Sequence, residues 1–453
     1  MQPVETKPQI DPDKSTQPVI PHPTFKTAFR FWVKLGFISF GGPAGQIAIM
    51  HHELVERKKW VSNERFLNAL NYCMLLPGPE AQQLATYIGW LLHRIPGGIV
   101  AGSFFVIPSI FILFALSYIY AAFGAIPLVA SVFGGLKAAV MAIVVSAVIK
   151  IGKKALKNGV MAGIAALSFV AIFFLRIPFP LIVLGAGLLG LVGRYTLSAK
   201  FDVIKGKNAR DFDAGYVQIC EDPEVCHINP SVGRNILLLA AFILLWLAPV
   251  IMLHVFLPHR VFYSEALFFT KAAFLTFGGA YAVLAYIAQA GVQQYAWLTG
   301  PQMIDGLGLA ETTPGPLIMV VQFVGFMAGW NHSAGWSPVV GGMVGSLVAT
   351  YFTFLPCFLF VFLGGPYIEK FRDNDTLSAA LSSITAAVVG VILNLAVWFG
   401  LQVLMPGDGG FNGFAAVIGV AAFISIQWLK LGMITVIAAA GAIGFIWYQI
   451  ILF

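Results

Sequence analysis

Charged residues are scarce in this chain. Asp, Glu, Lys and Arg make up 10% of its 453 residues, whereas a soluble domain carries about 25%. Hydrophobic residues make up 58%, and the mean hydropathy is +0.84. Several apolar runs exceed the roughly 18 residues that cross a bilayer. The clearest are 99–123, 128–149, 236–255 and the stretch that continues from 414–426 through 431–453. The composition excludes a soluble globular domain and predicts an integral membrane protein.

These apolar runs also lack the alternation of polar and apolar residues that a membrane β-strand requires. Hydrocarbon cannot satisfy backbone hydrogen-bonding groups, so only helices and closed barrels span a bilayer. Long runs without alternation exclude the barrel. The sequence therefore predicts an all-α integral membrane protein with about 13 helical segments.

Cysteine is the next scarcity, with four residues in the chain. Cys73 and Cys357 lie in apolar segments, where we expect them to be packing residues. Cys220 and Cys226 lie with His227 in a polar loop, but their spacing matches no common zinc pattern. The sequence also lacks a dinucleotide fingerprint and a cluster of thiolates. We therefore expect no metal, no cofactor and no catalytic residues.

The first 24 residues lack an apolar core, so they are not a signal peptide. Their polar composition predicts a disordered cytoplasmic tail. The net charge of +7 comes from short loops, where the positive-inside rule places Lys and Arg, and no basic stripe suggests nucleic acid. The expected environment is the lipid bilayer.

The chain resembles itself at a shift of 237 residues. At this shift Lys34 falls on Lys271, Trp60 on Trp297, the Phe-Gly-Gly at 40–42 on 277–279, and the Pro-Gly-Pro at 77–79 on 314–316. Further on, Pro108 falls on Pro356 and 138–140 on 386–388 at a shift of 248, which an insertion near 330–345 explains. An ordered set of matches indicates an internal repeat.

The repeat divides the chain into two homologous halves, 25–197 and 258–453. Between them lie a polar cytoplasmic linker, 198–233, and one apolar segment, 234–257. Each half has two segments interrupted by Gly and Pro and four that are unbroken, near 97–122, 128–150, 159–175 and 179–197 in the first half. An even number of segments followed by one extra crossing predicts that the second half is inverted.

Loop charges orient the first half with its amino end inside. Lysines gather at 150–157 and 200–207, whereas the turns at 123–127 and 176–178 are nearly bare. A second cluster of basic residues stays inside only if the Phe-Gly-Gly segment re-enters on the same side: Arg57, Lys58, Lys59 and Arg65. The matching stretch of the second half, 295–301, has no charge, as expected for an outer loop. We expect re-entrant or half-spanning segments; the alternative is 13 full crossings.

The four interruptions, called breaks below, predict an anion site. A break frees backbone groups that hydrocarbon cannot satisfy, so it persists only where protein or a watered cavity covers it. A helix that restarts after a break points its N–H groups and positive dipole end into that cavity. Breaks paired across inverted halves mark a transporter's binding site. The alternative is that they are proline kinks filled by neighbouring helices.

Polar side chains near the breaks supply further candidates. Gln46 follows the first Phe-Gly-Gly, and Gln82 and Gln83 follow the first Pro-Gly-Pro, so their amides could donate to a tetrahedral anion. Lys34 and Lys271 each precede a Phe-Gly-Gly break and could add charge, whereas snorkelling to the interface is the alternative. Lys26 and Arg30 share a helical face with Lys34 and could form a basic funnel. The acidic residues beside the breaks are candidates for proton coupling: Glu53, Glu80, Asp305 and Glu311.

At these residues the sequence resembles the chromate ion transporter family, in its long two-domain form. Residues 40–53 and 76–93 resemble the family's signature segments, and 276–287 and 312–325 resemble weaker copies. The resemblance implies export of chromate through the bacterial inner membrane, driven by the electrochemical gradient, with chromate resistance as the result and sulfate as a competitor. It implies substrate-binding roles at the signature positions of the first half: Gly41, Gly42, Pro43, Gln46, Pro77, Gly78, Pro79, Glu80, Gln82 and Gln83.

The second copy keeps the breaks at Gly278, Gly279, Pro314, Gly315 and Pro316 but loses the polar side chains. Ala280, Val283, Leu317, Met319 and Val320 stand where the first copy has Pro43, Gln46, Glu80, Gln82 and Gln83. We therefore expect the first half to dominate contact with the anion, while the second half shapes the gate.

Three other functions stay open at this point. The same motifs suit a carrier of sulfate or another oxyanion, and a passive anion channel would use the same inverted breaks. A membrane chromate reductase would need a flavin, haem or iron–sulfur centre, for which we find no motif. The sequence leaves the oligomeric state open, and a homodimer is one candidate.

Overall fold

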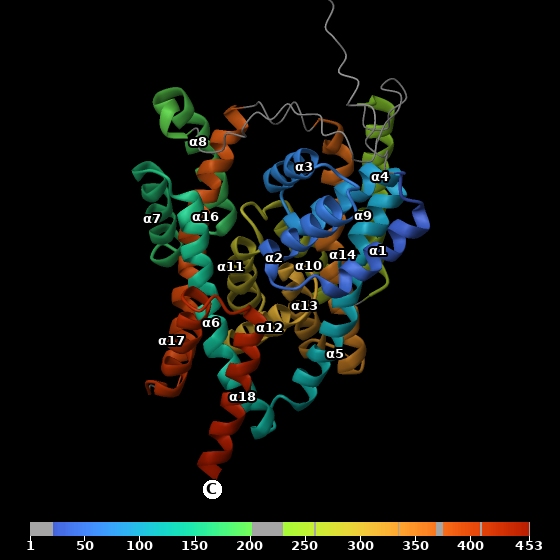
Figure 1. The fold of residues 1–453 in the computed structure, drawn as a ribbon. Helices are drawn as coiled ribbons and strands as arrows, with labels where there is room; N and C mark the ends of the chain where they lie inside the picture. The colour runs from blue at the N-terminus through green and yellow to red at the C-terminus, as the bar shows by residue number, and fades with distance from the viewer. Residues whose placement is uncertain are drawn as a thin grey trace, which may run out of the picture.

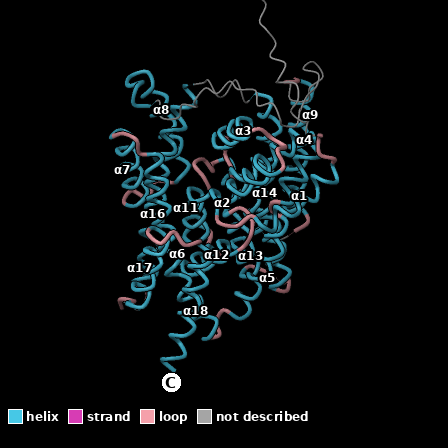
Figure 2. Tube along the Cα trace, in the orientation of Figure 1, coloured by secondary structure: helices cyan, strands magenta, loops and turns pink. Residues whose placement is uncertain are grey.

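The computed structural model describes residues 21–201, 230–257, 260–333, 335–367, 375–407 and 410–452. Every regular element in these ranges is helical (Figure 2). Most of the predicted tail lies outside the described residues, as do Cys220, Cys226 and His227 in the linker. Cys73 and Cys357 are both buried. The described part of the chain is thus the all-α bundle that its composition predicts.

The first half contains eight α-helices and a π-helical turn. They are α1 (Phe25–Ile38), α2 (Gly42–His51), η2 (His52–Arg57), α3 (Asn63–Leu75), α4 (Glu80–Phe104), α5 (Ile107–Phe123), α6 (Pro127–Ala155), α7 (Gly159–Phe173) and α8 (Phe179–Phe201). After the linker, α9 (Val232–Val255) leads to the second half. Both its position and its apolar composition agree with the single connecting segment expected there.

The second half repeats this order of elements. It contains α10 (Arg260–Phe274), α11 (Ala280–Gln289), η3 (Ala290–Gln294), α12 (Gly300–Thr312), η4 (Leu317–Met319), α13 (Val320–Asn331), α14 (Pro338–Gly364), η5 (Gly365–Tyr367), α16 (Asp375–Leu404), α17 (Gly413–Gln427) and α18 (Met433–Leu452). Each Phe-Gly-Gly and each Pro-Gly-Pro falls between two helices, as in the first half.

Within the described residues, six helical stretches are long and apolar enough to cross a bilayer. They are Glu80–Phe123, Pro127–Ala155, Val232–Val255, Pro338–Tyr367, Thr376–Leu404 and Met433–Ile450. On α9, large apolar side chains such as Leu237 and Leu244 are exposed, at 70% and 67%. Water would disfavour such surfaces, whereas lipid tails accept them. The chain is a multi-pass membrane protein.

Most helices beside the breaks are too short to cross on their own. At a rise of 1.5 Å per residue, α1 with its 14 residues is roughly 21 Å long, and hydrocarbon is about 30 Å thick. Within α4 the backbone is non-helical at His93 and Arg94, so Glu80–Phe104 is two helices joined by a reversal. Gly89 packs directly on the backbone of Gly97 across this reversal, and Gly329 packs on Gly341 in the same way between α13 and α14.

The longest unbroken helix of each half packs against unbroken helices of the other half. Helix α6 packs against α17 and α18, and α16 packs against α7 and α8. Since α6 matches α16, α7 matches α17 and α8 matches α18 in the repeat, these contacts are reciprocal. Figure 1 shows this group on one side of the molecule, with α6 and α16 running in opposite directions. The broken segments lie beside it, so the unbroken group forms a support for them.

Candidate functional site

The breaks of the two halves meet in a crossed pair of hydrogen bonds. The Gly78 N–H donates to the Thr276 carbonyl, and the Gly315 N–H donates to the Ser39 carbonyl, both at 2.8 Å. Ser39 and Thr276 occupy matching positions in the repeat, as do Gly78 and Gly315. Each Pro-Gly-Pro therefore contacts the Phe-Gly-Gly break of the other half. The four breaks thus lie close together among the helices (Figure 2).

Helix starts gather at this site without side-chain caps. Helices α2, α4, α11 and η4 begin directly after the breaks, and in each the residue before the helix makes no side-chain capping bond. By contrast, Thr24, Ser62 and Thr299 cap helices α1, α3 and α12. The first N–H groups of a helix have no partner within the helix. Uncapped starts therefore leave donors and positive dipole ends at the crossing of the breaks.

Glycine is required in the breaks by backbone conformation. Gly41 and Gly42 have φ of 89° and 67°, and Gly78 and Gly315 have φ of 128° and 104°. Residues with a Cβ rarely adopt these angles. The matching Gly278 and Gly279 have φ of 79° and 96°. The Gly and Pro pattern in the sequence thus correctly predicted where the helices stop.

The glutamine amides bind the breaks themselves. Gln46 donates from Nε2 to the carbonyl of Gly315, in the other half, and is 1% exposed. Gln83 donates from Nε2 to the carbonyl of Pro77 at 2.7 Å. Gln82 donates to the Thr86 hydroxyl at 3.1 Å. We expected these amides to donate to an anion. In this arrangement the nitrogens of Gln46 and Gln83 donate to carbonyls of the breaks, and that of Gln82 donates to Thr86 within α4.

Two residues outside the predicted anion site lie against the Pro-Gly-Pro breaks. Ser109 on α5 donates to the carbonyl of Pro314. Its repeat counterpart, Cys357 on α14, lies against Gly78, where its Sγ would be 2.9 Å from an added Cβ. The two positions match at the shift of 248 that Pro108 and Pro356 had shown. That alignment was the available signal, although it does not reveal what the side chains touch.

The basic candidates do not converge on the breaks. Lys34 Nζ lies 4.0 Å from Glu53 Oε1, and Arg57 Nη1 lies 3.0 Å from the same oxygen. Glu53 is buried, whereas the Lys34 side chain is 55% exposed. The other basic candidates, Lys26, Arg30 and Lys271, are exposed. Lys34 is thus placed beside a carboxylate at the surface, and a role for it at the anion remains a prediction.

The acidic candidates have separate surroundings. Asp305 on α12 is 2% exposed, lies 3.2 Å from Lys137 Nζ on α6 and accepts a 2.9 Å hydrogen bond from Tyr120. Glu311, also on α12, accepts a 2.7 Å hydrogen bond from Tyr281. Sequence reasoning did not identify Lys137, Tyr120 or Tyr281.

Glu80 lies beside the crossing of the breaks. It opens α4 directly after Pro79, and a Cβ added at Gly279 would lie 3.8 Å from its Oε1. It therefore faces the start of α11 in the other half. A carboxylate there occupies the kind of position that an anion would take at a helix start.

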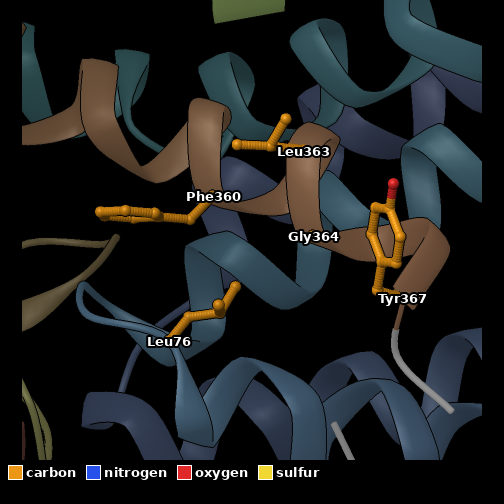
Figure 3. A pocket seen from close by; sticks show the side chains of 5 residues that line it. All are labelled: Leu76, Phe360, Leu363, Gly364 and Tyr367. Atoms are coloured by element: carbon orange, nitrogen blue, oxygen red, sulfur yellow. The ribbon is translucent and has the colours of Figure 1, made fainter. Parts of the chain in front are cut away.

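Two cavities in the described part of the chain are notable, and neither is lined by the Gly or Pro residues of a break. The larger, about 370 Å³, is lined by Leu76, Phe360, Leu363, Gly364 and Tyr367 (Figure 3). Its lining is almost entirely apolar, so it cannot compensate a dianion for its lost hydration. The smaller, about 190 Å³, lies between Pro178 and the end of α11 with η3. The two Pro-Gly-Pro breaks are buried, whereas Gly41 is exposed and Gly42, Gly278 and Gly279 are half-buried.

Comparison with known proteins agrees with the repeat and with the signature segments. The chromate transporter family matches residues 26–191 and 264–445. The chain is 30% identical to a chromate transport protein of Pseudomonas aeruginosa over 454 residues, covering 97% of this chain and 96% of the relative. It is 28% identical to a chromate transport protein of Cupriavidus metallidurans over 433 residues, covering 94% of both.

A more distant relative is an uncharacterized transporter of Methanocaldococcus jannaschii, 23% identical over 428 residues and covering 94% of this chain and 95% of the relative. No solved structure matches the chain. The two family matches fall on the two halves that carry the breaks, and together they cover well over half of the sequence. The chain belongs to the chromate transporter family.

Proposed function

We propose that this chain is a secondary active transporter that exports chromate from the cytoplasm and binds it where the four breaks meet. The observation that carries the proposal is the convergence of four helix starts that lack side-chain caps. Chromate is a tetrahedral dianion, and it requires donors from several directions. Uncapped helix starts on two crossed pairs of segments supply such donors.

The side chains around the breaks hold this set of donors in place. Gln46 joins the two halves by binding the Gly315 carbonyl, and Ser109 does the same for Pro314. These bonds occupy the freed carbonyls, which would otherwise repel an anion. The N–H groups of Gly78 and Gly315 already donate across the breaks, so those at the helix starts are the ones that remain for the substrate. The glutamines thus act by orienting the backbone, and direct contact with chromate requires that the breaks separate.

The two halves are proposed to have inverted topology. The crossed hydrogen bonds at Gly78 and Gly315 are what a two-fold relation between the halves produces. Helices α6 and α16 run in opposite directions in Figure 1, which supports an axis in the membrane plane. Furthermore, Gln294 and Pro178 line the same cavity. Pro178 belongs to the turn 176–178, which the loop charges predict to be outside, and Gln294 matches Arg57 in the repeat. Arg57 belongs to the basic cluster expected inside, which supports matching stretches on opposite sides of the membrane.

The direction of transport follows from the charge of the substrate. A membrane potential is worth about 2.3 kcal/mol per charge per 100 mV, so a dianion leaving a negative interior gains roughly 4.6 kcal/mol per 100 mV. Uptake would have to overcome the same amount. We propose export through a bacterial inner membrane, with the amino end cytoplasmic and chromate resistance as the consequence. Asp305, Glu311, Glu53 and Glu80 remain candidates for proton coupling.

Everted membrane vesicles test this function against its alternatives. With an imposed inside-positive potential, vesicles containing the protein should accumulate radiolabelled chromate, and sulfate should compete. Accumulation of sulfate alone would replace the chromate assignment by that of a sulfate carrier. Unitary currents in a planar bilayer would instead identify a channel. Vesicles that accumulate neither anion would remove the transport proposal.

A pair of matched double variants tests the asymmetry between the halves. Gln82→Ala with Gln83→Ala leaves the Pro77 carbonyl without its buried donor, which costs roughly 1–3 kcal/mol. We expect it to weaken chromate transport more than Met319→Ala with Val320→Ala, which removes only apolar packing. Equal losses from the two double variants would contradict a dominant first half.

A further inference from the structure

One buried carboxyl group has no part in the site described above. Glu265 lies on α10 with 0% of its surface exposed. Neither of its side-chain oxygens has a hydrogen-bond partner among the described residues. Buried polar groups in folded proteins are almost always hydrogen-bonded, and buried charges are paired. A fully buried and unpartnered carboxyl group therefore requires an explanation.

Glu265 lies where α10 crosses the hairpin of α13 and α14. A Cβ added at Gly345 on α14 would lie 3.2 Å from Glu265 Oε1 and would collide with the Gly325 carbonyl on α13. Because Gly325 and Gly345 have no side chain, α10, α13 and α14 can pack closely around the carboxyl group. In this closed arrangement no room is left for a water shell, so an ionised carboxylate is strongly disfavoured and the neutral acid is the form that fits.

No charged group from the surrounding helices compensates Glu265. Helix α10 packs against α9, α11, α13 and α14. The titratable residues of α10 itself are Arg260, Tyr263 and Lys271, and those of α9 and α11 are Arg234, His254, Tyr281 and Tyr286. Helix α14 adds Tyr351 and Cys357, and α13 has none. None of them makes a hydrogen bond or an ion pair with Glu265.

Packing alone does not require an acid at this position. Ala28, which matches Glu265 at the shift of 237, is also buried, at 2% exposure, in the corresponding helix α1. The first half therefore fills the same position with a methyl group. An apolar residue would avoid the desolvation of a carboxyl group. The asymmetry points to a role that only the second half performs.

We propose that Glu265 is a proton-binding site that exchanges one proton for each chromate that the carrier exports. The inference rests on the proposed transport function and names its coupling residue. The closed crossing of α10, α13 and α14 holds the protonated acid. When the crossing opens, water reaches the carboxyl group, which releases its proton and becomes a carboxylate. Proton binding from the outer side restores the neutral acid and allows closure.

The position of Glu265 explains how proton binding acts on the anion site. Helix α10 ends at Phe274, directly before the second Phe-Gly-Gly break, and Thr276 accepts the hydrogen bond from Gly78. Phe274 lies nine positions after Glu265 along this helix, which is about 14 Å. A movement of α10 away from α14 would therefore carry the break with it. Closure around the acid and closure of the breaks are linked through one rigid helix.

Reconstituted vesicles test this coupling. The full chain is placed in liposomes with potassium and valinomycin holding the potential at zero, and the lumen is made about one pH unit more acidic than the outside. With one proton exchanged per chromate, wild-type protein should accumulate radiolabelled chromate about tenfold. Glu265→Gln keeps the shape of the side chain but cannot release a proton. It should give no accumulation under the pH gradient while still moving chromate under an imposed potential.

Two further variants separate coupling from folding. Glu265→Asp retains an acid, so it should restore accumulation under the pH gradient, and Glu56→Gln, an exposed carboxylate bonded to His52, should behave as wild type. Accumulation by Glu265→Gln equal to that of wild type would overturn the proposal. So would a wild-type protein that moves chromate under a potential but ignores the pH gradient. Absence of chromate movement under either gradient would instead contradict the proposed function itself.

Discussion

Adding one methyl group at Gly315 tests whether the breaks are packed as closely as described. The backbone has φ of 104° there, which costs a residue with a Cβ about 1–2 kcal/mol. The new Cβ would collide with Ser109 Oγ and lie 3.3 Å from the Phe105 carbonyl. Overpacking of this kind costs about 1–3 kcal/mol. We therefore expect Gly315→Ala to destabilise the protein by roughly 2–5 kcal/mol.

Gly134 on α6 is the matched control. It has open space where a Cβ would be added, and alanine in a helix is favoured over glycine by about 0.5–1 kcal/mol. Thermal unfolding of the purified variants, followed by tryptophan fluorescence in one detergent, should place Gly315→Ala well below wild type and Gly134→Ala at or slightly above it. Equal midpoints for the two variants would refute the packing described at the break.

A double variant tests whether Ser109 is the residue that an added Cβ at Gly315 collides with. Ser109→Ala alone removes the hydrogen bond to the Pro314 carbonyl, which costs about 1 kcal/mol. Combined with Gly315→Ala, it also removes the colliding oxygen, so the double variant should be more stable than the sum of the single changes by roughly 0.5–3 kcal/mol. Strictly additive effects would show that the collision lies elsewhere.

Three other predictions concern topology and charge. Cysteines introduced at Lys58 and Tyr295 in a background without reactive cysteines should be labelled from opposite sides of the membrane by an impermeant maleimide; labelling from one side would make the halves parallel. Lys34→Ala should raise the chromate concentration that gives half-maximal transport, and an unchanged value would leave Lys34 as an interfacial residue paired with a carboxylate. Lys137→Ala leaves Asp305 buried without its cation, which costs about 3–5 kcal/mol, so its unfolding midpoint should fall more than that of Lys137→Ala with Asp305→Asn. A double variant less stable than the single one would contradict a buried pair.

The breaks could be located from the sequence because they depend on local chemistry. Glycine at positive φ and proline without an N–H end a helix wherever they occur. The self-similarity then showed that the breaks come in matched pairs. The expected insertion near 330–345 falls where α13 ends and α14 begins. In the first half the same reversal takes place within α4, at His93 and Arg94.

Side-chain partners could not be located in this way. Gln46 and Gly315 are 269 positions apart, and no feature of the sequence around either residue predicts their contact. The same holds for Lys137 and Asp305, which lie in different halves. Glu265 was missed because it stands in an apolar helix with no motif, opposite an alanine in the repeat. A partner is decided by three-dimensional packing, whereas a motif records only neighbours along the chain.

Composition, apolar run length and the repeated Gly-Pro pattern were sufficient to determine a helical membrane protein with two homologous halves and four interrupted segments. These properties follow from the bilayer, which demands satisfied backbone groups, and from local backbone sterics. The tertiary structure alone decided that each Pro-Gly-Pro break contacts the Phe-Gly-Gly break of the other half. It also decided that glutamine amides donate to carbonyls at these breaks. It also decided that one carboxyl group is enclosed without a partner. Contacts between distant segments depend on how helices pack, and no local rule specifies them.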